Sequence, residues 1–152
     1  MVESSTILAL EHEMSVLVRR LRRRIAERAR LVHPDLSPVG YSMLMALHDA
    51  GPQRASALVD LFGIDKGAVS RQVQLLIELG MIERKPDLAD GRAQILTISE
   101  LGRERLDAVA AARRVELTEK LGGWSDADLG DFVAMLARYN ASAAAAAEAD
   151  AG

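Results

Sequence analysis

Apolar side chains near the start of the chain recur in steps of three and four residues. Residues 5–32 carry one such series of apolar side chains at Leu10, Met14, Leu17, Leu21 and Ile25. This spacing places them on one stripe of a helix, because an α-helix completes a turn about every 3.6 residues. His33-Pro34 ends the helix, since the residue before a proline disfavours helical backbone angles. The pattern therefore predicts one long amphipathic helix.

A shorter helix is predicted over residues 38–50, where apolar side chains again follow a helical period. Ser37 precedes it as an N-cap, whose hydroxyl accepts a hydrogen bond from a backbone N–H of the first turn. Pro38 fits the first helical position, where no backbone N–H is needed. Gly51-Pro52 ends the helix.

Two more helices are predicted in the last third of the chain. Ser99 opens a long helix that reaches Leu121 and stops at Gly122-Gly123. Ser125 followed by Asp128 resembles a capping box, in which the two residues satisfy each other's backbone N–H groups. This pair predicts the start of a last helix.

The middle of the chain has the pattern of two short helices joined by a tight turn. Residues 54–62 form the first helix, residues 63–65 the turn and residues 66–79 the second helix, which Gly80 stops. Such a helix-turn-helix can place its second helix in the major groove of DNA.

A hairpin is predicted immediately after the second of these helices. Residues 81–86 and 93–98 read as two strands, and residues 87–92 as the tip between them. Asp90-Gly91 favours a turn, because glycine adopts a positive φ at little cost. A helix-turn-helix followed by a charged hairpin predicts a winged helix-turn-helix.

The order of elements predicts a mainly α-helical fold with a small β-hairpin wing. We expect residues 37–98 to form the winged helix-turn-helix DNA-binding region, and residues 1–36 and 99–152 to form a helical dimerisation region. The regions would make one intertwined domain. Neither of them would bury all its apolar faces alone, so a homodimer built from the two ends of the chain is predicted.

Composition narrows the class of protein. The net charge of −3 does not exclude a nucleic-acid partner, because phosphate contacts depend on a local basic face. The chain has no cysteine, which excludes disulfides and a thiol redox switch within it. A Gly-rich phosphate loop, a nucleophile elbow and a metal-ligand cluster are all missing, so we expect neither an enzyme nor a cofactor. We expect a cytoplasmic protein with no membrane partner, since no apolar run approaches the ~20 residues that span a bilayer.

A helical wheel of residues 66–79 separates a buried face from a face that can read bases. Val69, Val73, Leu76 and Ile77 share the buried side. Arg71 lies almost opposite them with Gln74 nearby, and these residue types can pair with guanine and adenine respectively. On the flanks, the predicted phosphate contacts are Lys66, Ser70 and Gln72.

The wing tip carries a second set of candidate DNA contacts. Arg92 follows the turn, where its side chain can enter an adjacent minor groove. Asp90 either pairs with Arg92 and holds it extended or only forms the turn. Arg84 and Lys85 are predicted phosphate contacts, the alternative being an ordinary solvated strand end.

Three segments together resemble the MarR family of bacterial transcriptional regulators, and the likeness covers almost the entire chain. These segments are residues 65–71, residues 79–84, and Asp90-Gly91-Arg92-Ala93 with residues 96–102. Gly67 departs from the Ser, Pro or Thr that is common in the family at the start of the recognition helix. The resemblance implies an obligate homodimer that binds pseudo-palindromic double-stranded DNA. It also implies a repressor. Many relatives release their DNA when a small, often phenolic or aromatic, effector binds to them.

The resemblance places such an effector between the dimerisation and DNA-binding regions. By their position on the first two helices, the residues expected to line this crevice are His33, Tyr41, Met43, Met45 and His48. For His48, a partly exposed helix histidine without a sensing role is the alternative. The histidines lack the close spacing of a zinc site, so no metal is expected.

One alternative keeps the fold and changes the partner. Some winged helices bind proteins and never DNA, and the net charge of −3 and the outward position of Leu75 favour that class. The placement of Arg71, Gln74 and Arg92 favours DNA. The two classes differ in salt dependence, because only DNA binding weakens steeply through counterion release.

Overall fold

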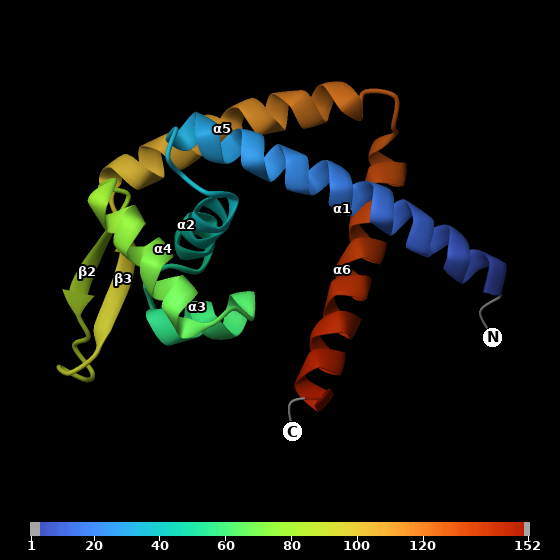
Figure 1. Cartoon of the computed structure of the whole chain (residues 1–152). Helices are drawn as coiled ribbons and strands as arrows, with labels where there is room; N and C mark the ends of the chain where they lie inside the picture. The colour runs from blue at the N-terminus through green and yellow to red at the C-terminus, as the bar shows by residue number, and fades with distance from the viewer. Residues whose placement is uncertain (1–3, 151–152) are drawn as a thin grey trace. The chain divides into compact units, whose positions relative to one another are not determined.

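The computed structural model describes the backbone of residues 4–150 and the side chains of residues 4–142. The elements are α1 (Ser4–Val32), α2 (Pro38–Ala50), β1 (Gln53–Arg54), α3 (Ala55–Phe62), α4 (Lys66–Glu78), β2 (Ile82–Pro86), β3 (Gln94–Ile98), α5 (Glu100–Lys120) and α6 (Asp126–Asp150). Every helix and both strands of the predicted hairpin are present, with ends that differ by one or two residues. The predicted mainly helical fold with a β-hairpin wing is confirmed (Figure 1).

The chain divides into two compact units, residues 1–111 and residues 112–152. The first holds α1 to α4, the sheet and the beginning of α5. Its core gathers buried side chains from all of these elements, among them Val32, Leu44, Leu58, Val69, Val73, Leu76, Ile82, Leu96 and Leu106. The buried face predicted for α4 is thereby confirmed at Val69, Val73 and Leu76, while Ile77 is half-buried.

The helix starts in the DNA-binding region are set by local hydrogen bonds. Ser37 caps α2, because its Oγ accepts from the backbone N–H of Gly40 at 2.9 Å. Asp65 caps α4 in the same way, through a 2.9 Å bond from the N–H of Ala68. Gly63 ends α3 with φ 59°, a left-handed conformation that glycine adopts without steric cost. Gly63 and Asp65 thus fix the turn between α3 and α4 and the start of α4.

The wing is larger than the predicted hairpin by one short strand. β2 and β3 pair antiparallel from Ile82 opposite Ile98 to Pro86 opposite Gln94. β1 adds to the other side of β3, so the strand order is β1-β3-β2. Arg54 therefore lies in a strand and at the N-cap of α3, which corrects its placement in the helix. Two residues are too few to show the alternation that identifies a strand.

The start of α5 is packed tightly against the end of α4. Ser99 Oγ donates to the carbonyl oxygen of Gly80 at 2.6 Å and accepts from the N–H of Gly102 at 3.0 Å. Gly102 is buried against the backbone of Met81, and a Cβ at this position would lie 2.2 Å from the Met81 carbonyl oxygen. Ser99 thus acts as the predicted N-cap and also ties α5 to the turn after α4.

In the second unit the predicted capping box opens α6. Ser125 Oγ accepts from the N–H of Asp128 at 3.1 Å, and Asp128 Oδ2 accepts from the N–H of Ser125 at 3.3 Å. The hydrogen bond from the Ser125 hydroxyl is the largest cause that lowers the pKa of the Asp128 carboxyl. Trp124 and Phe132 pack edge to face beside this cap, with ring centroids 5.7 Å apart.

Candidate DNA interface

The exposed face of α4 carries the residues predicted to read bases. Arg71 and Gln74 are both exposed, and they lie opposite the buried Val69 and Val73. Within residues 4–142 no hydrogen bond or ion pair engages the Arg71 guanidinium. Gln74 Nε2 donates to Glu78 Oε1 at 3.0 Å, one turn further along the helix. An arginine on an outward helix face with no internal partner has all its donors available for a guanine edge.

Gln72 is held more firmly than the sequence indicated. Its side chain is half-buried, and its Oε1 accepts a 2.7 Å hydrogen bond from the Ser37 hydroxyl. The same hydroxyl caps α2, so it joins the start of α2 to the middle of the recognition helix. Because its oxygen is already used, Gln72 has only its amide N–H groups for a phosphate. No local signal in the sequence links two residues that lie 35 positions apart.

A hollow between α3, α4 and the sheet brings several predicted phosphate contacts together. Its volume is about 340 Å³, and Val59, Val69, Val73 and Leu96 form its apolar wall. Lys66 and Ser70 of α4 line it together with Arg84 of β2. All three polar residues are exposed, and neither cation forms an ion pair within residues 4–142. Two elements, α4 and β2, thus contribute donors to one surface.

At the wing tip the structure separates the two roles considered for Asp90. Asp90 Oδ1 accepts from the backbone N–H of Arg92 at 3.2 Å, a contact that forms the turn. The Arg92 side chain is exposed, and no ion pair holds it in the part of the chain with described side chains. Lys85 lies 3.3 Å from Glu83 on the same strand, so its charge is partly offset, whereas Arg84 has no such neighbour.

Sequence reasoning missed an ion pair at the base of the wing tip. Arg54 Nε and Nη2 donate to Asp87 Oδ2 at 2.9 and 2.5 Å. Asp87 Oδ1 accepts from the N–H of Ala89 at 2.9 Å. The Ala89 N–H and then Arg54 lower the pKa of the Asp87 carboxyl, and the hydrogen bond to Asp87 raises the pKa of Arg54. The sequence did not indicate this pairing, because Arg54 and Asp87 lie 33 residues apart.

The residues predicted to line an effector crevice line neither the hollow beside α4 nor the cavity beside Arg22. Tyr41 and Met43 are 3% and 0% exposed and belong to the core, because α2 turns most of its apolar surface inward. Met45 is half-buried against the same core. His33 and His48 line neither the hollow beside α4 nor the cavity beside Arg22.

The two histidines contact carboxylates. His33 Nδ1 accepts from the backbone N–H of Asp35 at 3.2 Å. The His48 ring lies between two acids, with Nδ1 3.0 Å from Asp49 Oδ1 and Nε2 3.2 Å from Asp107 Oδ1. Among the described residues, no group of three His, Cys, Asp or Glu side chains could hold a metal ion. In the same residues, no helix is both long and apolar enough to cross a membrane.

A cavity of about 460 Å³ lies where α1, α2 and the turn after α3 meet. Its wall is mainly apolar, and its one charged lining residue is Arg22. The other residues that line it are Ile25, Pro38, Val39, Ser42, Phe62 and Ile64. The sequence pattern did not predict this cavity, because Phe62 at the end of α3 and Ile64 in the following turn come next to α1 only in the fold.

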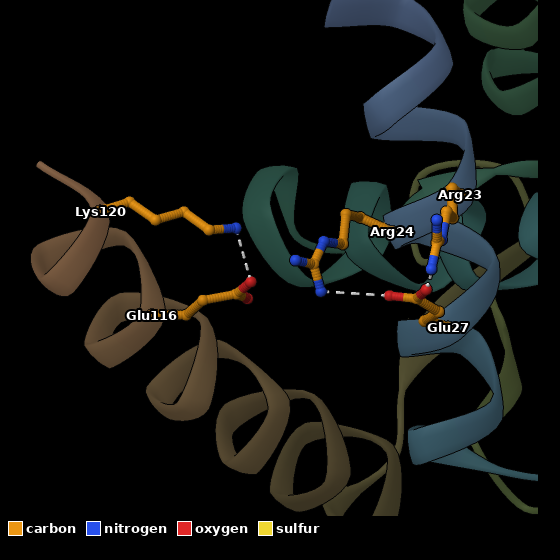
Figure 2. A network of polar contacts seen from close by, with 5 residues as sticks. All are labelled: Arg23, Arg24, Glu27, Glu116 and Lys120. Carbon is orange, nitrogen blue, oxygen red and sulfur yellow. Dashed lines mark hydrogen bonds and ion pairs between the residues drawn. The ribbon is translucent and has the colours of Figure 1, made fainter.

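The arginines of α1 are partly engaged within their own helix. Figure 2 shows Glu27 between Arg23 and Arg24, at 3.0 Å from Arg23 Nε and 3.2 Å from Arg24 Nη1. The hydrogen bond from Arg23 is the largest cause that lowers the pKa of Glu27. Figure 2 also shows Lys120 paired with Glu116 one turn apart on α5, at 2.7 Å. Such exposed pairs contribute little to stability, because water screens the two charges.

The known proteins that this chain resembles are transcriptional regulators. A family model described as the MarR family matches residues 35–93. An uncharacterised HTH-type transcriptional regulator of Bacillus subtilis is 29% identical over 140 residues, which are 92% of this chain and 96% of that protein. An uncharacterised HTH-type transcriptional regulator of Mycobacterium bovis is 32% identical over 124 residues, or 80% and 82% of the two chains.

The fold is also found among solved structures. A MarR family protein from Bacillus stearothermophilus superposes with a TM-score of 0.83 at 18% identity, over 95% of this chain and 99% of that one. A structure described as MarR superposes with a TM-score of 0.69 at 24% identity, over 89% and 97% of the two chains. At these identities the likeness establishes the fold.

Proposed function

This chain belongs to the MarR family of DNA-binding transcriptional regulators, and on that premise we propose that it is a homodimeric repressor of transcription. Two copies bind the two halves of a pseudo-palindromic operator in double-stranded DNA. The observation that carries the proposal is the exposed face of α4, where Arg71 has no internal partner beside a hollow with Lys66 and Arg84. Family members are transcription factors and not enzymes.

Each DNA-contact residue has a proposed role. Arg71 and Gln74 read base edges in the major groove. Phosphates are bound by Lys66, Ser70, Gln72, Arg84 and Lys85, which fix the register of α4. Arg92 enters the minor groove beside it, and Asp90 shapes the turn that presents Arg92.

Dimerisation is supported by apolar side chains that the single chain leaves exposed. On α1 these residues are Ile7, Leu8, Leu10, Leu17, Val18 and Leu21, and on α6 they are Phe132, Val133, Met135, Leu136 and Tyr139. Soluble monomers rarely expose so many neighbouring apolar side chains on a helix, so we propose that a second copy of the chain buries them. A dimer also places two α4 helices on one face of the DNA, about 34 Å apart or a multiple of that distance.

Repression is supported by one named relative. The HTH-type transcriptional repressor NicR of Pseudomonas putida is 29% identical over 81 residues, which are 53% of this chain and 51% of NicR. A dimer bound across an operator occupies the DNA that a polymerase would need, which is the simplest physical route to repression.

The cavity beside Arg22 is the proposed site of a small phenolic or aromatic effector. Apolar walls suit an aromatic ring, and the arginine can pair with a phenolate or carboxylate. The wall includes α1 from the dimerisation region and α2 and the α3–α4 turn from the DNA-binding region. A ligand that favours a different spacing of the two regions would weaken DNA binding, through its differential affinity for the two arrangements.

Selection from random duplexes tests the DNA-binding proposal. The purified protein is incubated with a pool of random double-stranded DNA, and the retained fraction is sequenced at two salt concentrations. We expect an enriched inverted repeat whose affinity falls steeply with salt, through counterion release. A folded dimer that enriches no sequence at low salt would contradict the proposal and favour a protein-interaction module.

The effector proposal is tested on the operator so obtained. The probe is 4-hydroxybenzoate, which should weaken operator binding by the wild-type protein. The Arg22→Gln variant should bind the operator as tightly as the wild type when the probe is absent, and its affinity should not change when the probe is added. Arg84→Gln is the matched variant at the other cavity. Loss of the response in Arg84→Gln alone would place the ligand in the hollow beside α4, and no response to a panel of phenols and aromatic acids would contradict effector control.

A further inference from the structure

Arg54 differs from the other arginines of residues 37–98, because its guanidinium is already bound by a carboxylate of the protein. Its two donors converge on one oxygen of Asp87, whereas Arg71, Arg84 and Arg92 have no ion pair within residues 4–142. We propose that Arg54 is a positioning residue that aims the wing tip at the DNA. The proposal rests on the DNA-binding function proposed above.

The side chain of Arg54 connects the two edges of the wing. Its backbone lies in β1 opposite Ile95 of β3, at one edge of the sheet. Asp87 directly follows β2, which forms the other edge. Arg54 is also the residue before α3, so the ion pair ties the hairpin to the first helix of the helix-turn-helix. A hairpin attached only by its own ladder would lack this second anchor.

Asp87 is placed to hold such an anchor. Its side chain is 12% exposed, and both carboxylate oxygens have partners, Arg54 and the N–H of Ala89. Its backbone N–H donates to the carbonyl oxygen of Ala93 at 3.0 Å, which closes the tip loop. The Arg54 side chain is 45% exposed, so only the carboxylate of this pair is sheltered. Two donors converging on one carboxylate oxygen, with the other oxygen also bound, hold the geometry better than a single-contact surface pair.

A short series of contacts leads from Arg54 to the proposed minor-groove residue. Arg54 Nη2 lies 3.9 Å from Asp90 Oδ2, and Asp90 Oδ1 accepts from the N–H of Arg92. The Asp90 carbonyl oxygen accepts from the N–H of Ala93 at 2.9 Å. A tip held in this way before binding loses less conformational freedom when Arg92 enters the groove.

The substitution Asp87→Asn separates positioning from simple charge. It removes a negative charge near DNA, so attraction to phosphates alone predicts tighter binding. If the ion pair aims the wing, binding should instead weaken by about two- to tenfold, the cost of ordering one or two side chains on binding. Glu104→Gln on α5 is the matched control, because Glu104 is exposed and its loss changes the net charge equally.

A double-mutant cycle asks whether Arg54 acts through Arg92. Arg54→Gln should weaken operator binding by a similar factor in the wild-type protein, and by much less in an Arg92→Ala background. Arg54→Lys keeps the charge and one donor, so its affinity should lie between those of the wild type and Arg54→Gln. Arg103→Gln on α5 controls for the lost positive charge.

Each other outcome overturns the inference. Additive losses with a salt slope reduced by about one would make Arg54 a direct phosphate contact. Asp87→Asn binding as tightly as the wild type or more tightly would remove the positioning role. Melting curves identify a variant that is unfolded, in which case Arg54→Lys decides the question. Failure of the DNA-binding proposal itself would appear earlier, as a wild-type protein with no operator.

Discussion

At the scale of single residues, freedom from internal partners distinguishes the side chains that can meet DNA. Arg71 is exposed and unpaired within the described side chains, while Gln72 on the next position is bound to Ser37. Neighbouring polar residues on one helix can therefore have different tasks. Base recognition is the role proposed for Arg71, whereas the hydrogen bond of Gln72 connects α4 with α2.

Replacement of Arg71 tests its proposed role in base recognition. Arg71→Ala should reduce operator affinity by about 1–3 kcal/mol and relax the preference at one base position. The measurement is the affinity for the operator and for single-base variants of it, with Arg103→Ala as a control for lost charge. An equal loss on every sequence would make Arg71 a phosphate contact.

Gly102 shows how a single missing Cβ fixes the approach of two elements. Its Cα faces the Met81 carbonyl so closely that an added methyl group would lie 2.2 Å from the oxygen. The obstacle is backbone and cannot rotate away. The close approach lets Ser99 reach the Gly80 carbonyl.

Gly102→Ala should therefore lower the free energy of unfolding by about 1–3 kcal/mol, the usual cost of overpacking a buried site. Gly130→Ala in α6 is the matched control, because no atom lies within 4 Å of its added Cβ. That substitution should be neutral or stabilising, by up to about 1 kcal/mol. Chemical denaturation of both variants measures the difference, and equal stabilities would contradict the packing argument.

At the scale of elements, one hydroxyl connects the start of α2 with the recognition helix. Ser37 Oγ accepts from the N–H of Gly40 and donates to Gln72 Oε1. Its removal leaves a helix N-terminus without its cap and a half-buried amide oxygen without its partner. The orientation of α4 thus depends on a residue that lies outside the helix-turn-helix.

Ser37→Ala should destabilise the protein by about 1–2 kcal/mol. Ser42→Ala in the same helix is the control, because the Ser42 hydroxyl donates only to the Pro38 carbonyl of its own helix. Thermal melts followed by far-UV circular dichroism compare the two variants. A loss in Ser42→Ala as large as that in Ser37→Ala would show that the cap has no special role.

At the scale of the whole molecule, the exposed apolar stripe of α1 supports the proposed homodimer. Leu17 of the predicted stripe is 47% exposed, whereas Ile25 at the other end of the stripe packs against the core, followed along the helix by the buried Ala29 and Val32. A stripe buried at one end and open at the other is typical of a helix that serves both the core and an interface.

Leu17→Asp should convert the dimer to monomer or aggregate, because a carboxylate in an apolar interface loses its hydration. Light scattering after size-exclusion chromatography measures the mass. Leu61→Asp, at a 62% exposed position on α3, should stay dimeric. A stable dimer of the Leu17→Asp variant would place the interface elsewhere.

The features that follow from local chemistry could be predicted from the sequence by itself. Ser37, Ser99 and the Ser125–Asp128 box mark helix starts, because capping involves residues three apart in the chain. The period of the apolar residues predicted the helices and the buried face of α4. Asp90-Gly91 predicted the turn of the wing. The residues that resemble the MarR family come from these same local segments.

Only the tertiary structure decided which distant residues meet. The Arg54–Asp87 ion pair spans 33 residues and the Ser37–Gln72 hydrogen bond spans 35, so neither leaves a periodic trace in the sequence. Packing likewise buried Tyr41 and opened a cavity beside Arg22 instead. Local patterns determine which elements form, whereas the contacts between elements depend on how all their apolar faces are buried together.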